Sequence, residues 1–234
     1  MSSNCSYWKK IGPVLALLLL ALAGTAWGHG VADADKAFIQ QSSGVQFVAF
    51  LYLGAKHMIT GYDHLLFLFG VIFFLYRVKD VGLYVTLFAL GHSITLLLGV
   101  LLQWQVNAYL IDAIIGFSVV YKALDNLGAW QQWFGVQPDT RAAVLIFGLF
   151  HGMGLATKLQ EFALAGDGLV SNLIAFNLGV EVGQFLALCG ILIAMAAWRL
   201  SSNFSRHAFA ANTVLMSAGF LLMGYQLIGY FYIS

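Results

Sequence analysis

The sequence predicts an all-α, multi-pass membrane protein with about six transmembrane helices behind a cleaved N-terminal signal peptide. Of its 234 residues, 61% are hydrophobic and 9% are charged, whereas a soluble domain carries about 25% charged residues. Apolar stretches of roughly 20 residues recur along the chain, and each is long enough to cross a hydrocarbon core about 30 Å thick. The formal net charge is +1 and no basic stripe occurs. We therefore expect the lipid bilayer, and no nucleic acid, as a partner.

Residues 1–28 have the three parts of a secretory signal peptide. Lys9 and Lys10 supply positive charge, residues 14–22 form an apolar centre, and small residues follow before His29, as signal peptidase requires. Cleavage would leave His29 at the mature N-terminus, where a free α-amino group beside an imidazole can chelate a divalent metal. An uncleaved first helix is the alternative interpretation of this segment.

After the leader, we expect a short periplasmic segment, residues 29–43, and a transmembrane domain, residues 44–234. The predicted spans are residues 45–77, 81–104, 106–127, 141–159, 169–200 and 207–233. The first is too long for one straight crossing, and Gly61 near its middle is expected to break or kink it. Lys and Arg concentrate in the loops that are cytoplasmic if the mature N-terminus lies outside. This bias predicts a bacterial inner-membrane protein with a periplasmic N-terminus.

Ionisable side chains occur inside these predicted spans, where each costs about 2.5–3.5 kcal/mol at the bilayer centre. Such groups generally face the interior of a helix bundle and have a partner or a function. The candidate metal ligands are His57, Asp63, His64, His92, His151 and Glu181, with possible support from Asp112, Asn177, Gln184, Ser93 and His29. The cluster at residues 57–64 has no packing benefit, so it predicts a functional site. His92 alone is equally compatible with a hydrogen bond to a nearby carbonyl.

Helical periodicity groups these side chains. His57 and His64 are seven residues apart and share one face if the helix continues past Gly61. Asp63 points about 100° away from His64, where it would bind the metal itself or hold a histidine.

Two later spans carry further polar positions. In the fifth span, Asn177, Glu181 and Gln184 form one stripe at i, i+4 and i+7, which favours either a polar site or hydrogen bonding between helices. In the fourth span, glycines surround His151. Small residues let neighbouring helices approach closely, which would bring imidazoles from different helices within reach of one ion.

Imidazole and carboxylate ligands without a thiolate cluster suit divalent ions such as Ni²⁺, Co²⁺ and Zn²⁺. Cu²⁺ uses the same ligand types, so spacing alone does not choose among these ions. Two functions other than transport fit the same residues. One is an intramembrane zinc hydrolase in which three histidines bind the metal and Asp63 or Glu181 acts as general base. The other is an accessory protein that delivers metal without transporting it.

The segment KHMITGYDHLLFLFGV resembles the metal-site motif of the HupE/UreJ family, small membrane proteins encoded with nickel hydrogenases and ureases. LFALGHSITLLLGV, IDAIIGFSVVYKALDN, FGLFHGMGLA and FNLGVEVGQ are similar to blocks of the second HupE/UreJ group, in the expected order over residues 45–190. The resemblance implies a six-helix nickel permease with a cleaved leader. It also implies that His57, Asp63 and His64 are essential for nickel uptake.

The same resemblance assigns three further positions. His92 matches the HS position of the family and His151 its HG position. Asp112 stands where the family more often has glutamate, which keeps the charge but shortens the reach. The resulting prediction is a permease, not an enzyme, that moves Ni²⁺ from periplasm to cytoplasm and has metalloenzyme maturation machinery as a potential partner. The nucleotide-binding pattern GxxxxGK[ST] is absent, so transport is expected to be passive or driven by the membrane potential.

Overall fold

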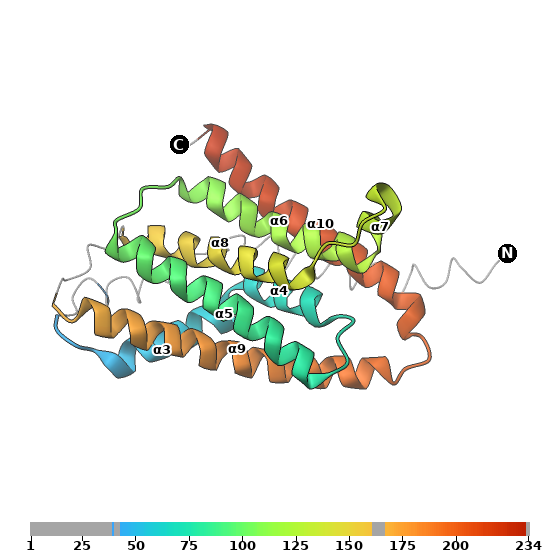
Figure 1. The fold of residues 1–234 in the computed structure, drawn as a ribbon, viewed down its shortest axis with the longest axis horizontal. Coiled ribbons are helices and arrows are strands. Elements are labelled where there is room, and N and C mark those ends of the chain that lie inside the picture. The colour runs from blue at the N-terminus through green and yellow to red at the C-terminus, as the bar shows by residue number, and fades with distance from the viewer. Residues whose placement is uncertain (1–38, 40–42, 161–166, 233–234) are drawn as a thin grey trace.

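A computed structural model describes Ile39 and residues 43–160 and 167–232, and within them every regular element is a helix. The predicted signal peptide and His29 lie outside the described residues. The helices are α3 (Phe47–Thr60), α4 (Tyr62–Ile72), α5 (Val78–Leu101), α6 (Ala108–Asn126), α7 (Ala129–Phe134), α8 (Thr140–Gln160), α9 (Leu169–Arg199) and α10 (Phe204–Tyr232). Figure 1 shows that most of them run along the length of one elongated bundle.

Four of the described helices, α5, α8, α9 and α10, are long and apolar enough to cross a membrane. α3 and α4 are shorter apolar helices, and α6 carries three charged residues, Asp112, Lys122 and Asp125. The predicted all-helical, multi-pass membrane protein is therefore confirmed, while the count of six crossings stays a prediction. The short helix α7 was not predicted, because its six residues lie in a polar loop.

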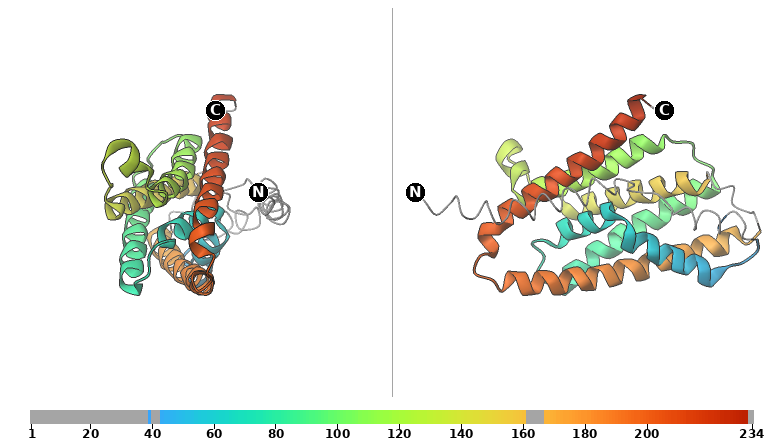
Figure 2. Two further views of the ribbon diagram at one scale, coloured as in Figure 1. Left: turned by 90° about the vertical axis from the view of Figure 1, so that its right-hand side faces the viewer. Right: turned by 180° about the vertical axis from the view of Figure 1, so that it is seen from behind.

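The first predicted span is divided into α3 and α4 by Gly61, as its sequence indicates. Gly61 has an extended conformation, with φ −74° and ψ 104°. Its amide donates to the carbonyl of His57 at 2.9 Å, and its own carbonyl accepts from the amide of Leu65 at 3.1 Å. Because the helix is broken, His57 and His64 do not share one face of a continuous helix. Figure 2, right, shows the two segments joined end to end on the side of the bundle nearer the viewer.

The helices associate mainly as three pairs, α3 with α9, α5 with α8 and α6 with α10. Between α3 and α9, a methyl group on Gly54 would overlap the carbonyl oxygen of Phe176, and one on Gly179 would overlap that of Leu51. Small residues thus bring the two backbones into direct contact. The glycines at the other two contacts are Gly91, Gly148 and Gly152 between α5 and α8, and Gly116 and Gly219 between α6 and α10. We call these three contacts the glycine seams.

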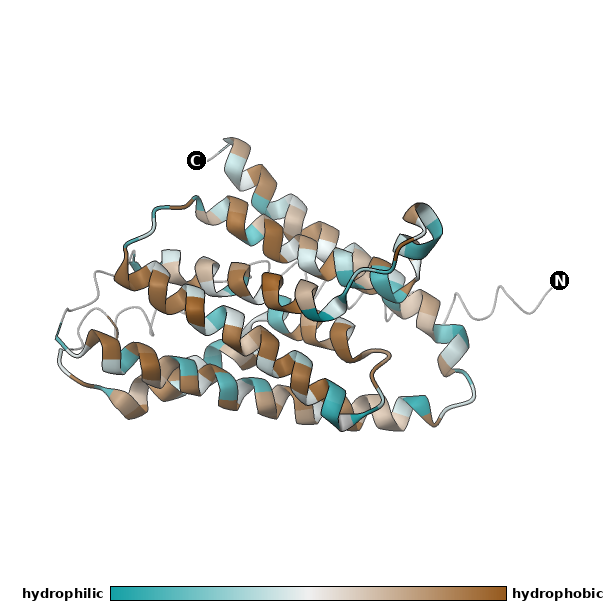
Figure 3. Cartoon of the chain, viewed as in Figure 1, coloured by the Kyte–Doolittle hydropathy of each residue, from teal (hydrophilic) through white to brown (hydrophobic). Residues whose placement is uncertain are grey.

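The two ends of the bundle are distinct. At the α7 end, Asn126 donates to the carbonyl of Gly70 at 2.9 Å and Arg199 donates to that of Phe73 at 2.8 Å, which ties α6 and α9 to the end of α4. At the opposite end, which we call the α3 end, Asn172 of α9 donates to the backbone just before α3 at 3.0 Å. Figure 3 shows hydrophobic residues along the helices and hydrophilic ones gathered where α6, α7 and α8 meet.

Candidate metal centre

The break at Gly61 positions three of the candidate ligands. His57 lies in the last turn of α3, and Asp63 and His64 lie in the first turn of α4. A Cβ atom at Gly61 would lie 2.9 Å from Nδ1 of His64 and 3.1 Å from Oδ1 of Asp63. Glycine at this position therefore leaves room for both side chains where the two helices meet.

Asp63 holds the ring of its neighbour His64. Oδ1 of Asp63 lies 3.0 Å from Nδ1 of His64, and both side chains are buried. An ionised carboxylate only accepts hydrogen bonds, so Nδ1 of His64 carries the proton and donates it. The lone pair of the imidazole is then on Nε2, which is the atom able to bind a metal ion.

His151, from the middle of α8, is oriented in the same way. Its Nδ1 lies 2.7 Å from the carbonyl oxygen of Phe147 in the preceding turn. Because a carbonyl only accepts, Nδ1 donates and the lone pair is again on Nε2. The ring centroids of His151 and His64 are 5.0 Å apart. Two imidazoles from different helices thus stand edge to face, each fixed in its tautomer by a neighbouring oxygen.

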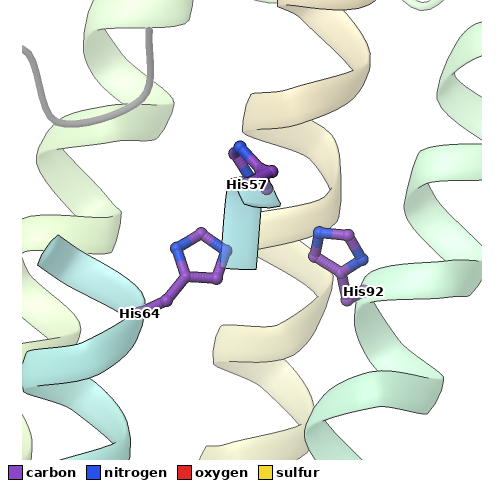
Figure 4. A group of neighbouring side chains, drawn as sticks. All are labelled: His57, His64 and His92. Atoms are coloured by element: carbon purple, nitrogen blue, oxygen red, sulfur yellow. The ribbon is translucent and has the colours of Figure 1, made fainter. Parts of the chain in front are cut away.

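His57 and His92 complete the group around His64. The ring centroid of His64 lies 5.0 Å from that of His57 and 6.2 Å from that of His92. Figure 4 shows these three rings, from α3, α4 and α5, grouped around a common space. His92 is fully buried.

Among the described residues, two sets of side chains have the arrangement of a metal site. One is His57, His64 and His92, and the other is Asp63, His64 and His151; in each set the candidate ligand atoms lie within 4.8 Å of one another. Bonds of about 2.0–2.1 Å to a tetrahedral ion require ligand atoms about 3.4 Å apart, so small side-chain rotations would complete either set. Nitrogen and oxygen ligands suit a divalent first-row ion.

Glu181 does not join these sets. It is exposed on α9, whereas Asn177 and Gln184 of the same predicted stripe are buried. Glu181 and Gln184 are three residues apart, so their side chains leave the helix about 60° apart around its axis. Glu181 is therefore turned away from the face that holds Gln184. Of the two carboxylates predicted as metal ligands, Asp63 therefore belongs to a ligand set and Glu181 does not.

The remaining predicted residues lie near the centre without belonging to it. Asp112 forms an ion pair with Lys158, with 2.6 Å between Oδ2 and Nζ. Ser93 is half-buried and follows His92 in α5, so its side chain points about 100° away from that of His92. This ion pair could not be predicted from the sequence, because Asp112 and Lys158 are 46 residues apart on different helices.

Comparison with known proteins gives one result. A family model described as HupE / UreJ protein matches residues 33–234. The chain belongs to the HupE/UreJ family. No curated protein and no solved structure matches it. HupE/UreJ membership, the four apolar helices and the histidine and aspartate sets together make this a multi-pass membrane protein connected with metal.

Proposed function

We propose that this HupE/UreJ protein is a permease for a divalent transition-metal ion, with Ni²⁺ as its substrate. The support is the convergence of four imidazoles and one carboxylate, from α3, α4, α5 and α8, into two ligand sets that have His64 in common. A permease needs binding that is favourable yet readily released, over more than one station. A shared ligand lets an ion change partners without returning to full hydration between the two sets.

The proposed path begins at His57. This side chain is the only partly exposed member of the first set, and every member of the second set is buried. An ion received by His57, His64 and His92 would pass to His151 while Nε2 of His64 stays bound and Asp63 holds Nδ1 of the same ring. The carboxylate of Asp63 compensates part of the charge of the dication at the deeper station. The carboxyl end of α3, where the helix dipole is negative, favours a cation at the first.

The proposed topology has six crossings, formed by α3 and α4 together and by α5, α6, α8, α9 and α10. The leader is cleaved after Gly28, residues 29–43 are periplasmic, and the domain of residues 44–234 lies in the bacterial inner membrane. The α3 end then faces the periplasm. A membrane potential negative inside drives the cation inward by about 2.3 kcal/mol per charge per 100 mV. Nickel released in the cytoplasm would supply the maturation machinery of a metalloenzyme.

The test is metal flux into vesicles that contain only the purified protein. We expect radioactive Ni²⁺ to accumulate when the inside is made negative, and His64→Ala to abolish this accumulation. His207→Ala, which removes a histidine of α10 outside both ligand sets, is the matched control and should transport as the wild type does. Tight metal binding with neither exchange nor flux would contradict the permease and favour an intramembrane enzyme or an accessory protein.

A further inference from the structure

Three phenylalanines lie directly on the α7 side of the metal centre. They come from α4, α5 and α8, the helices that supply the buried histidines. Each ring is displaced from a histidine of its own helix by three or four residues, which is one helical turn, and always toward the α7 end. The pairs are His64 and Phe67, His92 and Phe88, and His151 and Phe147.

Phe67 packs against the other two rings, and Phe67 and Phe88 pack against the ligands. The centroid of Phe67 lies 5.4 Å from that of Phe88 and 5.9 Å from that of Phe147. The ring of His151 is 4.9 Å from Phe88 and 5.6 Å from Phe67, again between centroids. Phe67 and Phe88 are each 1% exposed and Phe147 is 8% exposed. The phenylalanines therefore form a buried layer, linked by Phe67, that touches the imidazoles through Phe67 and Phe88.

The next turn toward the α7 end is apolar as well. Val71 follows Phe67 on α4, Val144 precedes Phe147 on α8, and both are buried in the same hydrophobic cluster as the three rings. The opposite side of the centre differs. One turn from His151 toward the α3 end stands Gly154, and a Cβ atom there would lie 3.3 Å from the carboxylate of Asp112. A carboxylate thus approaches the centre from the α3 side.

We propose that Phe67, Phe88 and Phe147 form an aromatic gate, which closes the α7 side of the metal centre to water, protons and monovalent cations. A contiguous apolar constriction excludes water and hydrated ions without any charged barrier. A bound ion stays at the histidines until the three phenylalanine rings move apart. The gate presupposes the transport proposed above, because a barrier of this kind matters only if a polar path reaches it.

Phe67 is the central member of the gate. It contacts both other rings and His151, and it follows His64, the ligand common to both sets, on the same helix. Rotation of the first turns of α4 would therefore move His64 and Phe67 together. Release of the ion and separation of the rings would then occur in one motion. Because Phe67 contacts both other rings, Phe67→Ala is the substitution expected to open the layer most.

The experiment measures proton leak without metal, in vesicles that contain the purified protein and a pH-sensitive dye inside. We expect the wild type to hold a pH gradient, and Phe67→Ala and Phe147→Ala to raise the leak about tenfold or more, since both shorten the hydrophobic constriction. Phe67→Leu keeps the layer apolar and should stay tight. Phe147→Ala removes the least buried ring, which keeps the test available if Phe67→Ala does not fold.

Phe73→Ala is the matched control for packing. Phe73 is also fully buried on the α4 side of the bundle but packs against Phe204 and Trp198, away from the histidines. Leak in Phe67→Ala and Phe147→Ala but not in Phe73→Ala supports the gate. Folded Phe67→Ala and Phe147→Ala proteins that both hold the gradient, or equal leak in all three, would overturn it. Nickel flux of the wild type in the same vesicles reports separately on the proposed function.

Discussion

The glycine seams and the metal centre are packed in opposite ways. At the seams, glycine lets backbones touch, as where Gly152 of α8 meets the carbonyl of His92 on α5. At the centre, bulky rings from α3, α4 and α8 contact one another, with polar atoms among them. Close backbone packing holds membrane helices together, whereas the buried imidazoles and carboxylate have a cost that packing does not explain. We therefore attribute the stability of the fold to the glycine seams and the binding of metal to the centre.

The largest expected effect is that of His64→Ala, because both ligand sets include His64. Loss of even an outer partner of a ligand lowers metal affinity about 10–100-fold, so loss of the common ligand should reduce nickel uptake at least about 100-fold. Uptake by vesicles measures the effect. The thermal unfolding temperature should not fall, and a large fall would show that the centre also stabilises the fold.

Gly179→Leu tests the seams. A side chain at this position overlaps the carbonyl of Leu51 on α3, and overpacking typically costs about 1–3 kcal/mol or more. We expect a lower unfolding temperature and a smaller yield of monodisperse protein, measured in detergent. Gly190→Leu is the control, since a Cβ atom there meets nothing within 4 Å. If the two variants were equally stable, close approach of α3 and α9 would not be what holds them.

Asp63→Asn separates charge from shape at the centre. The amide keeps the size of the side chain but removes its negative charge. Because an amide can donate as well as accept, it no longer requires Nδ1 of His64 to be the donor. Changes of this kind lower metal affinity about tenfold or more. Isothermal titration with Ni²⁺ measures it, and His207→Ala serves as the control. Unchanged affinity would remove Asp63 from the second ligand set.

The smallest effect is expected for Glu181→Gln. Glu181 is exposed on α9 and belongs to neither ligand set, so nickel uptake should stay within about twofold of the wild type, the range of surface substitutions away from a site. A loss comparable to that of Asp63→Asn would mean that α9 turns during transport and presents this carboxylate to the ion.

Much of this arrangement could be predicted from the sequence because hydrophobic length and glycine position are local signals. Apolar runs marked the long helices to within a few residues, and Gly61 marked the break. Periodicity gives the face of a residue but not which helix lies opposite. For that reason the pairing of Asp112 with Lys158 was not foreseen, and Glu181 was grouped with Asn177 although about 60° separates it from Gln184.

The layer formed by the three phenylalanines could not be predicted from the sequence for a similar reason. A phenylalanine one turn from a histidine is unremarkable on any single apolar helix. The pattern becomes visible only when α4, α5 and α8 are placed together and their three offsets are found to point toward the same end. Asp63 was predicted to diverge from His64 by 100°, yet the first turn after a break gives adjacent side chains the freedom to meet.

The break in the helix at Gly61 also sets the distance between His57 and His64. Seven residues of unbroken helix would set His57 and His64 about 10.5 Å apart along the axis, too far for one ion to bridge. The kinked chain brings their ring centroids to 5.0 Å. The spacing of the two histidines in the sequence therefore suits a bent segment. In a straight helix the two side chains would still be present, but they could no longer bind one ion together.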